Sequence, residues 1–275
     1  MTVAAEATAH RSRRRPRLKR IAQASVPYLL ILPVIVVITA ILGYPLYKLV
    51  TLSFQQYGLT ELIQRKGVWI GLDNYSSVIH DPVFWRVLLR TVIFTAANVA
   101  LTIGLGTAIA FLLVRVSTVV RILLTSGLVL VWSMPAVVAV QIWVWMTNFE
   151  NGVLNYVLTE LHVGDYTGHD WYGSTFSKLA MVTLLIVWGA IPFVAITVYA
   201  GLAQVPRELV EAAEIDGAGP VRVFRDVTFP VLRPIFLILT SLSIIWDFGV
   251  FTQPYLLIGS SAVDTSNYVM RFFSP

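Results

Sequence analysis

Five long apolar stretches most constrain what this chain can fold into. They cover roughly residues 27–52, 87–114, 122–146, 179–202 and 231–258. Each is too long for a strand, and each is too apolar for a helix on the surface of a soluble protein. A helix needs about 20 apolar residues to cross the hydrocarbon core of a bilayer. The sequence therefore predicts an all-α, polytopic transmembrane helical bundle with five spans.

The composition agrees with a membrane protein. Of the 275 residues, 57% are hydrophobic and only 13% are charged, whereas a soluble domain carries about 25% charged residues. There are no cysteines, which excludes disulfides, thiolate catalysis and cysteine-bound metals. The histidines lie outside the apolar stretches and lack the spacing of metal ligands. We therefore expect no metal site and no catalytic residues.

Basic residues predict the orientation of the chain. Seven of its twenty lysines and arginines lie between Arg11 and Arg20, directly before the first apolar stretch. Basic residues next to a span favour the cytoplasmic side, and anionic lipid would hold them there. A merely solvated tail is the alternative, and no folded basic face suggests nucleic-acid binding. We expect a basic cytoplasmic tail over residues 1–26, a membrane domain over 27–275 and a cytoplasmic loop over 203–230.

The loop over residues 203–230 is strongly charged but has the pattern of a helix. Pro206 and Glu208 suit a helix start, and Gly217, which tolerates positive φ, suits its end. A helix lying on lipid is usually rich in lysine and arginine, whereas this one is acidic. A groove on a protein partner is therefore favoured over the lipid surface.

The same loop carries a specific motif. Glu211-Ala212-Ala213 is followed by Asp216-Gly217-Ala218 and, after a spacer, by Phe229-Pro230. This pattern resembles the EAA loop of ABC importer permeases. The resemblance implies the type I importer permease (MetI-like) fold, with a cytoplasmic coupling helix that docks on a separate ATPase. The coupling residues it implies are Glu208, Glu211, Ala212, Ala213, Asp216, Gly217 and Ala218.

Other motifs resemble the carbohydrate-uptake branch of that family, typified by the larger, MalF-type maltose permease. They are Thr51-Leu52-Ser53-Phe54, Gly71-Leu72-Asp73-Asn74-Tyr75, Asp81-Pro82-x-Phe84-Trp85, Gly152-x-Leu154-Asn155 and Phe248-x-x-Phe251. The basic N-terminus before a compact permease is similar to actinobacterial members, among them mycobacterial trehalose importers. The resemblance implies sugar import, with a disaccharide such as trehalose as the solute.

The resemblance also implies an assembly in the bacterial cytoplasmic membrane. The partners are a second permease of MalG type, two ATPase subunits that bind ATP and magnesium, and an extracytoplasmic solute-binding lipoprotein. The chain itself has no Walker A motif, so we expect no cofactor in it. Permeases of this branch have a sixth core span after the segment that matches 231–258. Because the sequence ends at Pro275, we expect either a truncated chain or a further segment beyond it.

One acidic residue predicts where a solute could bind. Asp247 is the only aspartate or glutamate well inside an apolar stretch, and an ionisable residue at membrane depth is a candidate functional group. A satisfied helix–helix hydrogen bond, or pairing with a basic residue of a partner subunit, is the alternative. Aromatic faces with hydrogen-bond acceptors suit a sugar. The resemblance implies solute contacts on both sides of the EAA loop, at Gly189, Ala190, Phe193, Ser243, Trp246, Asp247 and Val250.

Three other functions remain open from the sequence. A permease for glycerol phosphate, a polyamine or an oxyanion would keep the loop and change the cavity, but an anion would want a basic residue in mid-span, and none is present. An integral membrane enzyme would need clustered catalytic groups near an interface. An ion channel would need a repeated polar face along its pore. The sequence shows neither feature.

Overall fold

The computed structural model describes residues 17–64 and 66–258. The chain divides into two compact units between Phe84 and Trp85. Most of the expected basic tail lies outside the described residues, although helix α1 already begins at Arg17.

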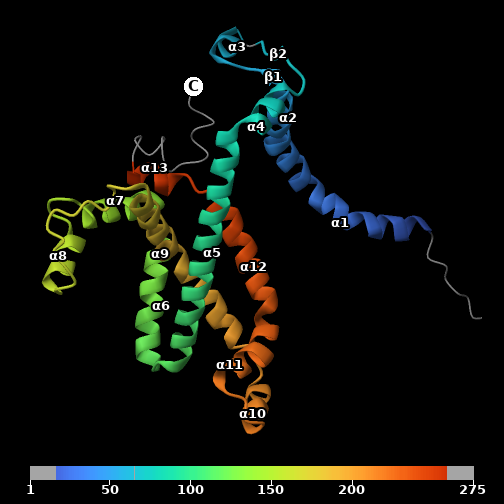
Figure 1. Cartoon of the computed structure of the whole chain (residues 1–275). Helices are drawn as coiled ribbons and strands as arrows, with labels where there is room; N and C mark the ends of the chain where they lie inside the picture. The colour runs from blue at the N-terminus through green and yellow to red at the C-terminus, as the bar shows by residue number, and fades with distance from the viewer. Residues whose placement is uncertain (1–16, 65, 259–275) are drawn as a thin grey trace, which may run out of the picture. The chain divides into compact units, whose positions relative to one another are not determined.

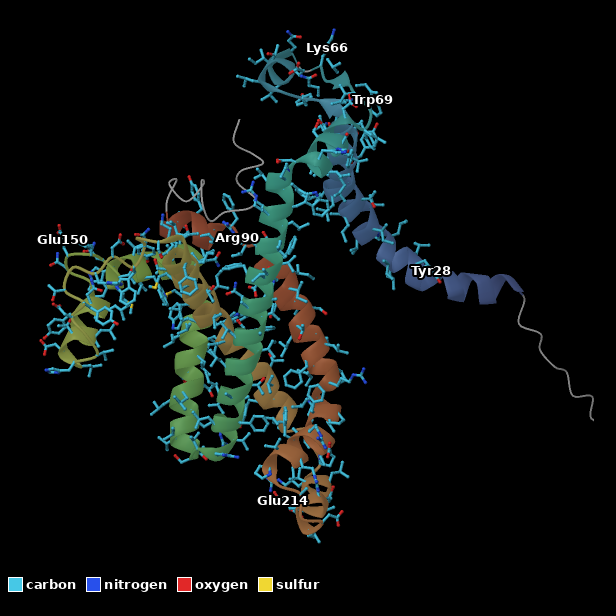
Figure 2. All side chains as sticks on the ribbon, viewed as in Figure 1. Tyr28, Lys66, Trp69, Arg90, Glu150 and Glu214 are labelled. Carbon is cyan, nitrogen blue, oxygen red and sulfur yellow. The ribbon has the colours of Figure 1, made fainter. Side chains whose placement is uncertain are left out.

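The first unit is a long helix followed by a small polar subdomain. Helix α1 (Arg17–Ile38), the π-helical turn η1 (Thr39–Gly43) and helix α2 (Tyr44–Ser53) follow one another without a gap (Figure 1). Tyr28–Ser53 is long and apolar enough to cross a membrane, and its side chains, from Tyr28 onward, are almost all exposed within the chain (Figure 2). Such exposure fits a helix that is surrounded by lipid or packed against a partner helix.

The subdomain is fastened to the end of α2 by the residues of the Gly71–Tyr75 motif. It contains β1 (Gln55–Gln56) and β2 (Val68–Trp69), which pair antiparallel, with α3 (Leu59–Gln64) and α4 (Asp73–His80). Asn74 Nδ2 donates to the carbonyl oxygens of Ser53 at 3.0 Å and Gln55 at 2.9 Å. This short hairpin is a minor addition to the predicted all-α fold.

The second unit contains the remaining helices, apart from the first three residues of α5, which belong to the first unit. They are α5 (Pro82–Arg115), α6 (Thr118–Ser133), α7 (Ala136–Met146), α8 (Val153–Glu160), α9 (Thr175–Leu202), α10 (Arg207–Ile215), α11 (Pro220–Val223), η2 (Phe224–Thr228), α12 (Phe229–Phe248) and α13 (Thr252–Ile258). Helix α5 starts as predicted, with Pro82 first and Asp81 Oδ1 accepting from the Val83 N–H at 2.8 Å. Helices α10 and α11 lie at one end of this unit, and α7, α8 and α13 lie at the other (Figure 1).

Two predicted spans differ from the structure. A single helix over 122–146 is wrong, because α6 and α7 meet at 104°. Pro135 disfavours a helical conformation in the residue before it, and Met134 is extended, with ψ 128°. The predicted span over 231–258 likewise ends at Phe248, and α13 begins anew at Thr252. Among the described residues, four unbroken helices are long and apolar enough to span, with the bent α6–α7 pair as a fifth candidate.

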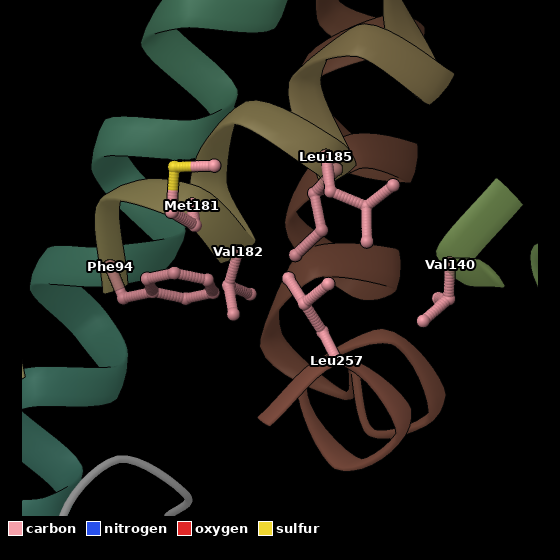
Figure 3. Packing of buried hydrophobic residues seen from close by; sticks show 7 residues of the cluster. Phe94, Val140, Met181, Val182, Leu185 and Leu257 are labelled. Carbon is pink, nitrogen blue, oxygen red and sulfur yellow. The ribbon is translucent and has the colours of Figure 1, made fainter. Parts of the chain in front are cut away.

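Helix α9 lies at the centre of the second unit. One buried cluster joins it to α5, α7 and α13 through Phe94, Met181, Val182, Val140 and Leu257 (Figure 3). A second cluster joins it to α5 and α12, with Ala110, Val194, Val198, Leu232 and Leu239. Since α9 also packs along α6, it contacts nearly every long helix of the unit.

Candidate functional site

A cavity of about 270 Å³ lies against the middle of α9. We call it the aromatic cavity. Its wall comes from the α6–α7 break, α9, the end of α12 and the start of α13. Six of the seven sequence-predicted solute contacts line it, namely Gly189, Ala190, Phe193, Trp246, Asp247 and Val250. The seventh, Ser243, is buried one turn before Asp247 on α12 and does not line the cavity.

Aromatic rings form much of this wall. Trp132 stacks on Phe193, with ring centres 5.7 Å apart and planes 16° apart. Trp246 meets Phe193 edge-on at 5.7 Å and 61°. Phe193 therefore joins the ends of α6 and α12, and three rings lie together beside a single carboxylate.

Asp247 is the only charged residue among the described residues that line the aromatic cavity. Its side chain is mostly buried. It makes no ion pair, and its carboxylate has no hydrogen-bond partner among the residues that the structure describes. The satisfied helix–helix hydrogen bond that we considered as an alternative is therefore not present within this part of the chain. An unpaired buried acceptor is costly unless something donates to it, so the carboxylate is suited to a ligand hydroxyl or to water.

Sequence reasoning missed the part of the wall that comes from α6, α7 and α13. Trp132, Met134, Ala136 and Gln253 line the aromatic cavity but were not predicted to do so. A continuous span over 122–146 would not place residues on both sides of Pro135 around one space. The proline in mid-stretch was the available signal, because it marks a probable helix boundary.

The predicted coupling helix is present as α10. Pro206 precedes its first residue in an extended conformation, rather than forming the first turn. Gly217 follows it with φ 77°, and the Ala218 N–H closes the turn on the Ala213 carbonyl at 2.9 Å. The predicted end of the helix is thereby confirmed.

Helix α10 presents its predicted coupling residues outward. Glu208, Glu211, Ala212, Asp216 and Gly217 are exposed, while Ala213 and Ala218 are half-buried. Two apolar side chains are exposed among them, with Leu209 at 51% and Ile215 at 86%. An acidic surface with exposed apolar side chains suits contact with another protein.

A cleft of about 700 Å³ lies between α10 and the nearby ends of α5, α6 and α9. We call it the α10 cleft. It is lined by Glu211 and Glu214 of α10 together with Arg115, Arg121 and Arg207, and Glu214 lies near the tip of this unit (Figure 2). The chain thus places basic residues at the end of the bundle that carries α10.

The loop between α8 and α9, at the opposite end of the unit, is held by side-chain hydrogen bonds. The side chain of Asn155 donates to the His169 carbonyl at 3.1 Å and accepts from Trp171 Nε1 at 2.5 Å. The hydroxyls of Thr147 and Tyr172 are 2.8 Å apart, and burial raises the pKa of Tyr172 above its usual value. The motif that contains Asn155 therefore holds the loop between α8 and α9 in shape.

Residues 100–272 match the family described as binding-protein-dependent transport system inner membrane component. This chain belongs to that family. The match covers α10 and every predicted solute contact. It confirms a multi-pass inner-membrane transport permease rather than an enzyme, a role in which the chain needs no cofactor of its own.

Named relatives and a solved structure agree with this assignment. The chain is 45% identical over 245 residues to the diacetylchitobiose uptake system permease protein DasB of Streptomyces coelicolor, covering 89% of this chain and 75% of that one. It is 29% identical to the trehalose/maltose transport system permease protein MalF of Thermococcus litoralis, covering 86% and 78%. A crystal structure of a bacterial ABC transporter involved in alginate import matches with a TM-score of 0.71 at 18% identity, over 94% of this chain and 87% of that one. This match confirms the predicted permease fold.

Proposed function

We propose that this chain is one permease subunit of an ATP-driven importer for a disaccharide or another small neutral glycoside. The observation that carries the proposal is the aromatic cavity, whose wall gathers six residues expected to contact solute. The names of the relatives support the solute class, since DasB and the Thermococcus MalF belong to uptake systems for disaccharides.

The chemistry of the aromatic cavity suits a neutral sugar. Trp132 and Trp246 are 55% and 50% exposed within the chain, so ring surface remains available to stack on the C–H face of a pyranose. Asp247 can accept hydrogen bonds from hydroxyls, and the Gln253 amide can both donate and accept. No lysine or arginine lines the described wall, which disfavours an anion such as glycerol phosphate. A polyamine would need more than one carboxylate.

The higher identity to DasB favours an N-acetylated, chitobiose-like disaccharide over trehalose. Trehalose, which the resemblance to mycobacterial importers implied, is the second candidate. The two sugars differ in their acetamido groups and in their glycosidic linkage, so a direct competition experiment separates them.

The proposed assembly has three kinds of partner. A second permease of MalG type completes the path, two ATPase subunits dock on α10 and its counterpart, and an extracytoplasmic binding lipoprotein delivers the sugar. Glu208, Glu211 and Asp216 would meet basic residues of the ATPase. Arg115, Arg121 and Arg207 lie at the α10 end, which supports a cytoplasmic location for that end.

The proposal is tested by purifying the assembly from its native membrane through a tag on this chain. Mass analysis should identify a second permease, an ATPase present in two copies and a sugar-binding lipoprotein. The assembly, purified from washed membranes, should then release a disaccharide when it is denatured. Recovery of this chain without an ATPase, under conditions that preserve other importers, would refute the proposed function.

A further inference from the structure

Helix α6 connects the two sites that transport must couple. Arg121, in its first turn, lines the α10 cleft, and Trp132, in its last turn, lines the aromatic cavity. Sixteen residues of α-helix extend about 24 Å at 1.5 Å per residue. The resemblance to ABC importer permeases implied a coupling role for α10 and none for α6.

Arg121 holds the corner between α5 and α6 together. Its guanidinium donates to the carbonyl oxygens of Leu113 at 2.7 Å, Val116 at 3.1 Å and Val114 at 3.4 Å. The Leu113 and Val114 carbonyls belong to the last turn of α5, which lacks partners within the helix, and Val116 directly follows that helix. A planar group with several donors can satisfy all three, whereas a lysine ammonium would have to reach them from one point.

The same guanidinium also faces α9. It lies 5.8 Å from the centre of the Tyr199 ring, within the range of a cation–π contact. We call this the cleft-end contact. Trp132 stacked on Phe193 joins the same two helices at the other end, and we call that the cavity-end contact. Helices α6 and α9 are therefore fixed to each other at both the α10 cleft and the aromatic cavity.

We propose that Arg121 is the positioning residue that makes α6 follow α9 when α10 is displaced. This inference rests on the proposed function. Helix α10 follows α9 after only four residues, 203–206, so a pull on α10 acts first on the Tyr199 end of α9. The cleft-end contact passes that displacement to α6, whose last turn carries Trp132 into or out of the aromatic cavity. A contiguous set of packed contacts of this kind is a physical basis for coupling.

The test uses the complete assembly in proteoliposomes and measures sugar uptake and ATP hydrolysis in the same sample. In Arg121→Gln we expect hydrolysis to stay within about twofold of wild type while uptake per ATP falls roughly tenfold, the effect of losing hydrogen bonds from a charged group. Tyr199→Leu keeps the carbonyl bonds of Arg121 and should also lower uptake per ATP. Tyr199→Phe keeps the ring and should restore it. A residue that only stabilised the fold would lower both rates together.

Arg115 provides the matched control. It lines the same cleft, but its side chain has no hydrogen-bond, ion-pair or ring contact within the described residues. Arg115→Gln should therefore leave uptake per ATP unchanged. Equal loss in Arg115→Gln and Arg121→Gln would overturn the inference, because a general change of charge in the cleft would then explain both.

A movement assay tests the same inference directly. The chain has no cysteine, so a single cysteine at Leu130, which is 68% exposed on α6, can carry the one fluorophore of this chain when it is labelled before assembly with its partners. ATP should change its emission in the wild-type background and not in Tyr199→Leu. An unchanged response in Tyr199→Leu would contradict the inference. Absence of ATP-driven uptake in the wild-type assembly would instead contradict the proposed function.

Discussion

Replacing Gly106 by alanine tests how closely α5 and α9 must pack. A Cβ atom at this position would lie 2.6 Å from Val194 Cγ1, 2.7 Å from Val194 Cβ and 3.3 Å from the backbone nitrogen of Ala195. Val194 and Ala195 are almost fully buried, and a branched side chain next to backbone has little room to turn away. The two helices therefore have to separate locally.

The matched control is Gly104→Ala in the same helix. A Cβ atom there meets nothing within 4 Å. Both substitutions gain about 1 kcal/mol of helix propensity, while overpacking at Gly106 costs about 1–3 kcal/mol. The difference between the two variants is therefore about 1–3 kcal/mol, with Gly104→Ala the more stable.

Thermal unfolding of the purified variants in detergent measures this difference. Gly104→Ala should melt at or above the wild-type temperature, and Gly106→Ala should melt below Gly104→Ala. Equal melting temperatures for the two variants would contradict the close approach of α5 to α9 at Gly106.

Three further predictions concern the ends and the middle of the second unit. Glu211→Lys should abolish sugar-stimulated ATP hydrolysis, because the lysine would face basic residues of the ATPase groove. Membrane insertion, measured by fractionation, should be unchanged. Normal stimulation of hydrolysis would remove Glu211 from the docking surface. Asp247→Asn should raise the sugar concentration for half-maximal uptake roughly tenfold, through weaker hydrogen bonds to hydroxyls, and unchanged uptake kinetics would remove Asp247 from the path. Burial raises the pKa of Tyr172 above 10.0, so the unfolded chain loses this proton first and stability should fall as the pH rises beyond about 10. Tyr172→Phe should weaken that decline in melting scans from pH 9 to 11, whereas an equal decline would assign it to other groups.

Local rules predicted much of the fold. The length of each apolar stretch predicted α5, α9 and the start of α12, because hydrocarbon requires about 20 apolar residues in a helix. Asp81 and Pro82 predicted the start of α5, and Gly217 predicted the end of α10, because caps depend only on neighbouring residues. These are short-range effects, and they hold whatever surrounds them.

The breaks in the helices were harder to predict. Proline is tolerated inside membrane helices when neighbours satisfy the freed backbone groups, and α9 runs through Pro192 without a break. The sequence alone gives no reason why Pro135 should redirect the chain by 104° while Pro192 does not. The difference depends on tertiary packing.

The candidate sites also combine features that local sequence predicts with features that depend on tertiary packing. The residues of the predicted path on α9 and on and just after α12 could be named from the resemblance to permeases, and all but Ser243 line one cavity. Trp132, Gln253 and the contacts of Arg121 could not be named, because each depends on how α6, α7 and α13 are placed around α9. Pairwise packing across distant segments leaves little trace in a single sequence.

The central claim is that a partner ATPase drives a small neutral glycoside through this permease. The most direct measurement is uptake by proteoliposomes that contain the purified assembly and its binding protein, with labelled diacetylchitobiose or trehalose outside and ATP trapped inside. We predict uptake of at least one of these sugars that requires hydrolysable ATP and stops when the binding protein is omitted. Uptake that continues without ATP, or an active ATPase that moves neither sugar, would contradict the account.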